Sequence, residues 1–161
     1  FQQMKPMGVL ALLISKPSGC PEPVSYENRI MGMAQKKQIE VTGLETPQEQ
    51  LDLFDNLPAD TVVKEIMKMI KGGESEDNTL EKLTSAYKQQ DLPKVHALIK
   101  ESKDLDMGGF LDTRNEKWIP RMIQKMDQHP VFFAVGAGHL TGEVGLIELL
   151  KKEGYKVEAV K

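Results

Sequence analysis

The stretch VFFAVGAGHLTGEVGLIELLKKEGYKVEAV, residues 131–160, decides the fold that the sequence predicts. The five apolar residues 131–135 predict a buried strand, and the amphipathic segment 142–153 predicts a helix that stops at Gly154. The segment 155–160 then predicts a second strand. A strand, a crossover helix and a strand form a βαβ unit, so we expect the two strands to be parallel.

The same pattern of elements extends toward the N-terminus. The segment IEVTGLE, residues 39–45, predicts another strand, and Thr46, Pro47 and Glu49 together predict a capped helix start. Residues 79–102 predict two helices joined by a turn, a helical hairpin. We therefore expect an α/β fold, with α+β as the fallback: a small, mostly parallel sheet flanked by helices, with the hairpin as an arm.

Length and charge limit the classes of protein that the chain can represent. A chain of 161 residues predicts one domain, residues 1–161, with the hairpin inside it. The formal net charge of −3 provides no basic field, so nucleic acid is not an expected partner. The longest apolar run, residues 8–14, is too short to be a transmembrane segment and predicts a helix. The only cysteine, Cys20, excludes an internal disulfide.

A glycine-rich turn follows the predicted strand 131–135 and contains His139. Ligands in open α/β sheets gather at the carboxyl ends of strands, which is where this histidine is expected. Thr141 could cap the next helix, and Glu143 would lie in its first turn. An imidazole at this place can bind a divalent metal or transfer protons, and a nearby carboxylate can orient it. Alternatively, His139 hydrogen-bonds the turn and Glu143 stabilises the helix dipole.

Three further residues are candidates for the same site. Glu45 directly follows an apolar strand and must be solvated, paired or metal-bound. Arg114 is expected in the first turn of a helix, where the dipole disfavours a cation, so an anionic partner explains it better. For Glu45 and for Arg114, an exposed surface position is the alternative. The third residue, Asn115, has as its alternative a purely structural role at the start of the helix. We interpret the other histidines, His96 and His129, as structural or solvated.

Several segments together resemble the TraB/GumN family, which is related to the TIKI proteases and to pheromone shutdown proteins. The resemblance rests on FQQMKPMGVLALL at the start, VTGLETPQEQLDLFDNLP at 41–58, LDTRNEKWIPRMIQKM at 111–126 and FFAVGAGHLTGEVGLIELLKKEGYKVEAV at 132–160. It implies that this chain is the C-terminal half of a TraB/GumN-like domain, and that the N-terminal half, with a GTxH-type motif, precedes it. A start at Phe1, inside a predicted helix, agrees with that expectation.

The resemblance also implies a site and an activity. Glu45, Arg114 and His139 would share one polar cleft, with Asn115 and Glu143 as further binding residues. The expected activity is metal-dependent hydrolysis, peptidase-like, with His139 and Glu45 as ligands of Mn, Co or Zn, or as base and orienter. Arg114 would hold a carboxylate or the developing oxyanion. Without the preceding half, the chain alone could be inactive.

Two other functions stay open at this point. The first is a non-catalytic module that binds or sequesters a peptide or a small anionic ligand, in which Arg114 dominates the affinity. The second is an interaction scaffold built on the hairpin around Tyr87. The resemblance further implies an extracytoplasmic location, which is periplasmic, secreted or lipid-anchored.

Overall fold

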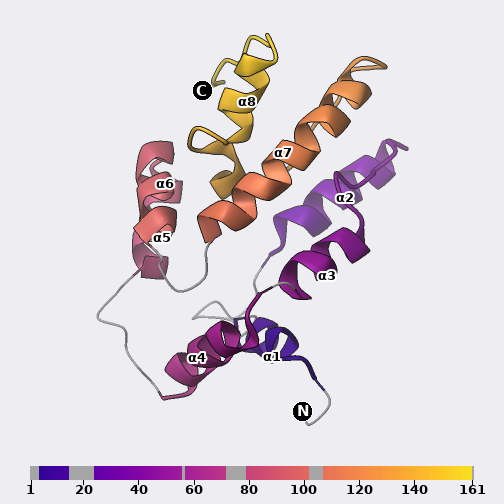
Figure 1. The fold of residues 1–161 in the computed structure, drawn as a ribbon. Coiled ribbons are helices and arrows are strands. Elements are labelled where there is room, and N and C mark those ends of the chain that lie inside the picture. The colour runs from indigo at the N-terminus through magenta and orange to yellow at the C-terminus, as the bar shows by residue number, and fades with distance from the viewer. Residues whose placement is uncertain (1–3, 15–23, 56, 72–78, 102–106, 161) are drawn as a thin grey trace. The chain divides into compact units, whose positions relative to one another are not determined.

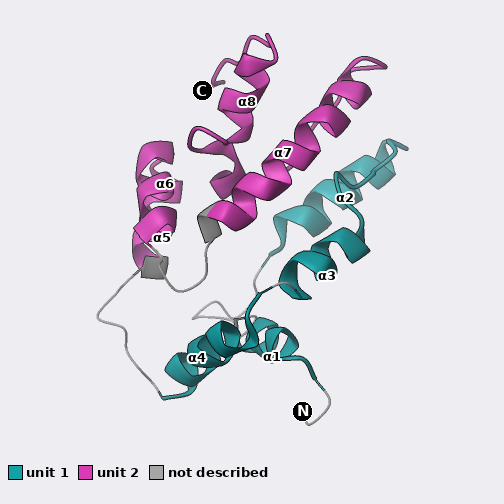
Figure 2. Cartoon of the chain, in the orientation of Figure 1, with its two compact units in different colours: residues 1–73 teal, residues 74–161 magenta. Residues whose placement is uncertain are grey.

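The computed structural model (Figure 1) describes residues 4–14, 24–55, 57–71, 79–101 and 107–160. Cys20 lies outside these ranges. The chain divides into two compact units, Phe1–Gly73 and Glu74–Lys161 (Figure 2). The prediction of one domain over 1–161, with the hairpin of 79–102 inside it, stays a prediction.

Helices form all the regular structure of the described residues. Unit 1 contains α1 (Pro6–Ile14), α2 (Tyr26–Lys36), α3 (Pro47–Asp55) and α4 (Ala59–Ile70). Unit 2 contains α5 (Thr79–Lys88), α6 (Leu92–Glu101), α7 (Met107–Met126), the short 3-10 helix η1 (Ala137–Leu140) and α8 (Leu146–Lys152). The helix expected at 8–14 is therefore present as part of α1.

The expected sheet is absent from the part of the chain that the structure describes, so the α/β prediction and its α+β fallback are wrong. Segments 39–45, 131–135 and 155–160 are neither helix nor strand. Exposure still alternates along 131–135, where Phe132 and Ala134 are exposed and their neighbours are half-buried. The alternation typical of a strand is thus retained, but a strand also needs a hydrogen-bonded neighbour, and none of these segments pairs with another.

The core of unit 1 lies between α1 and α4, which pack against each other. Leu10 of α1 and both Val62 and Ile66 of α4 are buried. Val62 and Ile66 are four residues apart, so they lie on one face of their helix. The apolar run that the sequence placed in a helix therefore has α4 as its packing partner.

The start of α3 confirms the predicted cap. The backbone N–H of Thr46 donates to Glu49 Oε2 at 2.8 Å, and the backbone N–H of Glu49 donates to Thr46 Oγ1 at 3.1 Å. Pro47 is the first helical residue. This reciprocal pair satisfies two N–H groups that the first turn of a helix cannot bond internally.

Replacing Thr46 by alanine is expected to lower the free energy of unfolding of unit 1 by about 1 kcal/mol, because the Glu49 N–H loses its acceptor. Serine at the same position keeps the hydroxyl and should stay within a few tenths of a kcal/mol of the original chain. Urea unfolding followed by far-ultraviolet circular dichroism measures both variants. Equal losses for alanine and serine would show that the cap does not stabilise α3.

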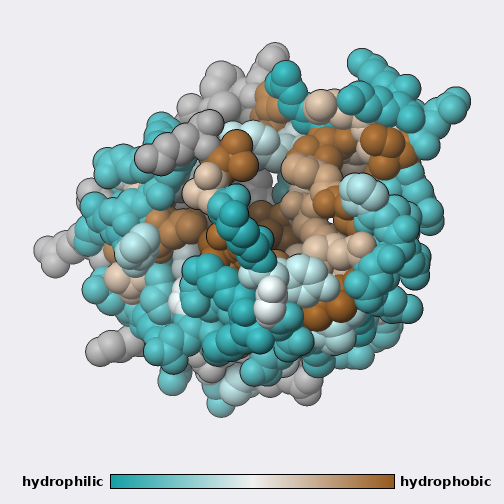
Figure 3. Space-filling model, turned by 90° about the horizontal axis from the view of Figure 1, so that it is seen from above, coloured by the Kyte–Doolittle hydropathy of each residue, from teal (hydrophilic) through white to brown (hydrophobic). Residues whose placement is uncertain are grey.

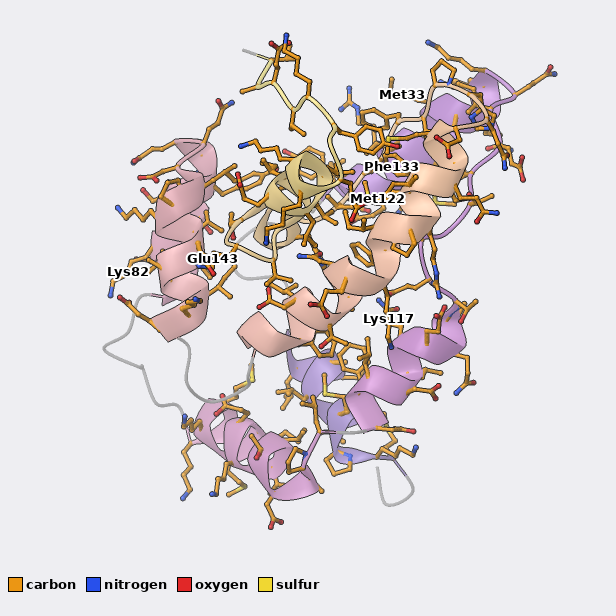
Figure 4. All side chains as sticks on the ribbon, turned by 45° about the horizontal axis from the view of Figure 1, so that its top comes forward. Met33, Lys82, Lys117, Met122, Phe133 and Glu143 are labelled. Atoms are coloured by element: carbon orange, nitrogen blue, oxygen red, sulfur yellow. The ribbon has the colours of Figure 1, made fainter. Side chains whose placement is uncertain are left out.

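Unit 2 is built around α6 and α7. The α5–α6 pair, residues 79–101, has its own small core of Ala86, Val95 and Leu98, while Tyr87 is exposed. α6 packs against both η1 and α7, and α7 packs against α8 and η1. Figure 4 shows Lys117 and Met122 extending from α7 in different directions, and Lys117 is exposed whereas Met122 is buried.

The end of α8 confirms Gly154 as the predicted helix stop. Gly154 has a φ of +88°, its N–H donates to Lys151 O at 3.0 Å, and the N–H of Tyr155 donates to Leu150 O at 3.0 Å. These two bonds define a Schellman motif, which favours glycine because of the left-handed φ. The start of the helix differs from the prediction, since α8 begins at Leu146 after Gly145 and Thr141 does not cap it.

The surface in Figure 3 is largely hydrophilic and is interrupted by hydrophobic residues. Among the large hydrophobic side chains of the described residues, Phe132 is one of the most exposed, with 80% of its surface accessible. Over the described ranges, no helix combines the length and the apolar character needed to cross a membrane. The expectation of no transmembrane segment agrees with that finding.

Candidate functional site

The candidate site centres on η1, which carries His139. This short helix contacts α6, α7 and α8, so three helices surround the histidine. Only 6% of the surface of His139 is accessible. A buried imidazole must find hydrogen-bond partners within the protein, because leaving its polar nitrogens without them would cost free energy.

Asn115 of α7 provides that partner and is itself only 1% exposed. Its Oδ1 lies 2.7 Å from His139 Nδ1. Its Nδ2 donates to the backbone oxygen of His139 at 3.2 Å and to that of Val144 at 2.9 Å. One amide side chain therefore holds the ring of His139, its backbone and the loop that leads to α8.

These contacts determine which nitrogen of His139 carries a proton. Carbonyl oxygens only accept, so both N–H groups of the Asn115 amide must face the His139 and Val144 oxygens. Oδ1 then faces Nδ1 as an acceptor, and Nδ1 must donate. In the neutral ring the lone pair consequently lies on Nε2, which is the form of histidine that binds a metal or accepts a proton.

Aromatic and cationic groups cover another side of the histidine. The ring centroids of Trp118 and His139 are 4.4 Å apart with an angle of 32° between the planes. The guanidinium of Arg114 lies 4.7 Å from the Trp118 ring and 5.6 Å from the ring of Phe110. Phe110, Arg114 and Trp118 are spaced four residues apart, so α7 presents them along one face. Cation–π attraction holds the guanidinium at this place.

α6 reaches the same turn through His96. The Nδ1 of His96 lies 3.3 Å from Thr141 Oγ1, and Thr141 Oγ1 donates to the backbone oxygen of Gly138 at 3.3 Å. Thr141 is buried and follows η1 directly. The loop after His139 is thus tied both to α6 and to the start of η1.

Two glycines make this loop sterically feasible. Gly142 has a φ of +85°, and a Cβ added there would overlap the His96 ring, whose Nδ1 would lie 2.8 Å away. A Cβ on Gly145 would collide with the backbone oxygen of Thr141 and would lie 2.7 Å from that of Leu140. The glycine-rich sequence therefore reflects close approach of backbone and ring as well as turn geometry.

Three of the five predicted site residues come together in unit 2. Asn115 contacts His139 directly, and Arg114 is linked to it through the ring of Trp118. The prediction that Arg114 lies in the first turn of a helix is wrong, however, because α7 begins at Met107. It has local stabilisation from two aromatic rings, so its position does not itself require an anionic partner.

The two acidic candidates lie elsewhere. Glu143 is exposed in the loop between η1 and α8 (Figure 4), and it is not in the first turn of a helix as expected. Glu45 is half-buried just before α3 in unit 1. Its role beside His139, like the roles of the other predicted site residues, stays a prediction.

The residues described fit one part of a metal site. His139 has the orientation of a ligating histidine, whose second nitrogen is hydrogen-bonded to a neighbouring group. A zinc centre usually has three or four protein ligands. No group of three His, Cys, Asp or Glu side chains that could hold a metal gathers within the ranges that the structure describes. His139 therefore fits as a single ligand, and a complete set would need others.

Sequence reasoning missed Trp118, and it interpreted His96 as structural or solvated without identifying the contact with Thr141. Trp118 follows Asn115 by three residues and Arg114 by four, so helical spacing places all three on adjoining faces of α7, and that spacing could have revealed it. His96 lies beside the buried Val95 on α6 and is half-buried. Nothing in the sequence alone indicates its contact with Thr141, which is 45 residues away along the chain.

Comparison with known proteins places this chain in a family. The chain matches the profile described as "TraB/PrgY/gumN family" over residues 1–159. The chain belongs to the TraB/PrgY/gumN family, and the resemblance inferred from sequence is confirmed. No solved structure matches it.

Two curated relatives are similar to part of the chain. The "Metalloprotease TIKI homolog" of Nematostella vectensis is 45% identical over 51 residues, which cover 30% of this chain and 11% of the relative. "Metalloprotease TIKI1" of Danio rerio is 40% identical over 48 residues, which cover 28% of this chain and 10% of the relative. The matched part therefore spans about a tenth of the length of each of these relatives.

Proposed function

We propose that this chain contributes His139 to the site of a metal-dependent hydrolase that acts on peptides. The observation that carries the proposal is the anchoring of Nδ1 by Asn115 at 2.7 Å, because it directs the lone pair of the neutral ring to Nε2. Metal-binding histidines are commonly held in this way by a group on their other nitrogen. Membership of the family and the partial similarity to two metalloproteases support the same conclusion.

The residues around His139 would have separate roles. Asn115 fixes the tautomer, and the ring of Trp118 excludes water from one side of the imidazole. Arg114 would hold a substrate carboxylate or the developing oxyanion, since a guanidinium presents several N–H donors in one plane. Glu45 lies in unit 1, and its role as a metal ligand stays a prediction. A divalent ion, Mn²⁺, Co²⁺ or Zn²⁺, would supply an activated water when bound. An extracytoplasmic location belongs to the same proposal and is supported by the family resemblance.

A binding module is the second candidate function. The observation that favours it is the placement of Arg114 against Phe110 and Trp118, which pre-organises a guanidinium for a peptide carboxylate or a small anion. In that case affinity depends on Arg114 and does not require a metal. Retention of peptide binding in the presence of a chelator, together with its loss in Arg114→Gln, would favour the module over the hydrolase.

A calorimetric titration of the metal-stripped chain with Mn²⁺, Co²⁺ and Zn²⁺ tests the hydrolase proposal. One binding site is expected in the original chain, and His139→Gln should lose it because the amide has no imidazole nitrogen to offer. His129→Gln is the matched control, since His129 is exposed in unit 2 and should leave binding unchanged.

Other outcomes would count against the proposal. Equal affinity in the original chain and in His139→Gln would show that His139 is not a ligand. Absence of binding to the original chain would contradict a metal site in this chain and would leave the binding module as the better explanation. Thermal unfolding of both variants checks that a lost site does not reflect a lost fold.

A further inference from the structure

His96 is a half-buried histidine of α6 that the proposed site does not use. Its Nδ1 lies 3.3 Å from Thr141 Oγ1. Its ring also lies against the backbone of Gly142, so closely that a methyl group there would overlap it. Gly142 has a left-handed φ, which brings the loop backbone toward the ring. This loop begins two residues after His139.

The direction of the hydrogen bonds follows from the protons available. Thr141 has one hydroxyl proton and donates it to the oxygen of Gly138 at 3.3 Å. Thr141 Oγ1 must therefore accept from His96, and Nδ1 of His96 donates. A neutral ring with its proton on Nδ1 and a protonated ring can both make this bond. The result is a chain of two hydrogen bonds from α6 to the residue directly before His139.

α6 makes a second contact with η1 one turn further along. A Cβ added to Gly138 would lie 3.0 Å from Ile99 Cδ1. His96 and Ile99 are three residues apart and therefore lie on the same face of α6. That face meets η1 and its following loop at Gly138, Thr141 and Gly142. From α7, Asn115 holds the ring and the backbone of His139.

We propose that His96 is a positioning residue for His139, and that the α5–α6 pair acts on the site through it. The bond to Thr141 fixes the turn that carries His139, so its loss should let η1 shift relative to Asn115. The proposal rests on the proposed function where it concerns metal binding. Where it concerns the restraint of η1, it can be measured without any ligand.

Two substitutions of His96 separate the hydrogen bond from simple packing. Asparagine places an amide N–H near the position of Nδ1, whereas leucine fills comparable space and donates nothing. The His139 N–H donates to Gly136 O at 3.0 Å, so its hydrogen exchange reports on the integrity of η1. Exchange at this amide is expected to be about fivefold faster in His96→Leu, in line with one lost hydrogen bond, and close to the original rate in His96→Asn. His129→Leu is the control.

Metal affinity gives a second readout. Changes to residues that orient a ligand typically weaken metal binding by roughly 10- to 100-fold. A loss of that size is expected in His96→Leu but not in His96→Asn. Absence of metal binding by the original chain would overturn the proposed function alone, because the exchange rates still test the restraint of η1 by His96.

Thr141 completes the test. Thr141→Val removes the hydroxyl and should resemble His96→Leu, whereas Thr141→Ser should retain slow exchange. If both residues act through one bond, the double variant His96→Leu with Thr141→Val should be no faster in exchange than the worse single variant. Additive effects, or equal effects of leucine and asparagine at residue 96, would overturn the proposal and reduce His96 to a packing contact.

Discussion

Replacing Asn115 by leucine is expected to lower the free energy of unfolding by roughly 3–5 kcal/mol. The side chain makes three hydrogen bonds, to His139 Nδ1 and to the backbone oxygens of His139 and Val144. Leucine has a similar size but makes no hydrogen bond, so all three groups lose the hydrogen bond that Asn115 provides. Each buried polar group that loses its partner costs about 1–3 kcal/mol, and one of the three is only partly buried.

Urea unfolding of the complete chain measures this effect. Glu116→Leu is the matched control, because it makes an apolar replacement at the next residue of α7, which is exposed, and it should change the free energy of unfolding by less than about 0.5 kcal/mol. A loss below about 1 kcal/mol in Asn115→Leu would show that the amide does not join α7 to η1 as described.

Gly145→Ala is the second substitution with a large expected effect, a decrease of about 3 kcal/mol in the free energy of unfolding, at the upper end of the usual cost of overpacking. Gly145 has a φ of −71°, which alanine tolerates, so the cost comes from space alone. The added methyl group would collide with the backbone oxygens of Thr141 and Leu140. Backbone cannot rotate away as a side chain can, so the loop after His139 would have to move.

Gly154→Ala provides the contrasting control in the same unit. No atom lies within 4 Å of a Cβ at this position, but the φ of +88° disfavours alanine, so a loss of about 1–2 kcal/mol is expected. Comparison of the two midpoints in thermal unfolding separates a collision from a strained backbone. A smaller loss for Gly145 than for Gly154 would contradict the tight loop.

Local features of the chain could be predicted from the sequence, because they depend on neighbouring residues. The cap formed by Thr46 and Glu49 and the stop at Gly154 are set by interactions across three to five residues, and both are confirmed. Thr141 shows the limit of this reasoning. Its hydroxyl could cap a helix, yet it donates a hydrogen bond to the backbone oxygen of Gly138. The helix α8 begins only after the close-packed turn at Gly145.

The sheet could not be predicted correctly, because pairing depends on distant segments. Residues 131–135 have the composition and alternation of a strand, but these properties describe a backbone that is ready to pair and do not identify a partner. For the site, the family resemblance and not a local pattern placed Arg114 and Asn115 in one cleft with His139. His96 reaches the site from another helix, and the sequence contains no local pattern for that contact.

The contact between Trp118 and His139 has an experimental consequence. Trp118 is the only tryptophan of the chain, and its ring centroid lies 4.4 Å from that of the histidine. A protonated imidazole beside an indole quenches the indole's fluorescence more strongly than a neutral imidazole does. The tryptophan fluorescence of this chain, excited selectively over its three tyrosines, therefore originates at the candidate site, where a change in the charge of His139 alters its intensity.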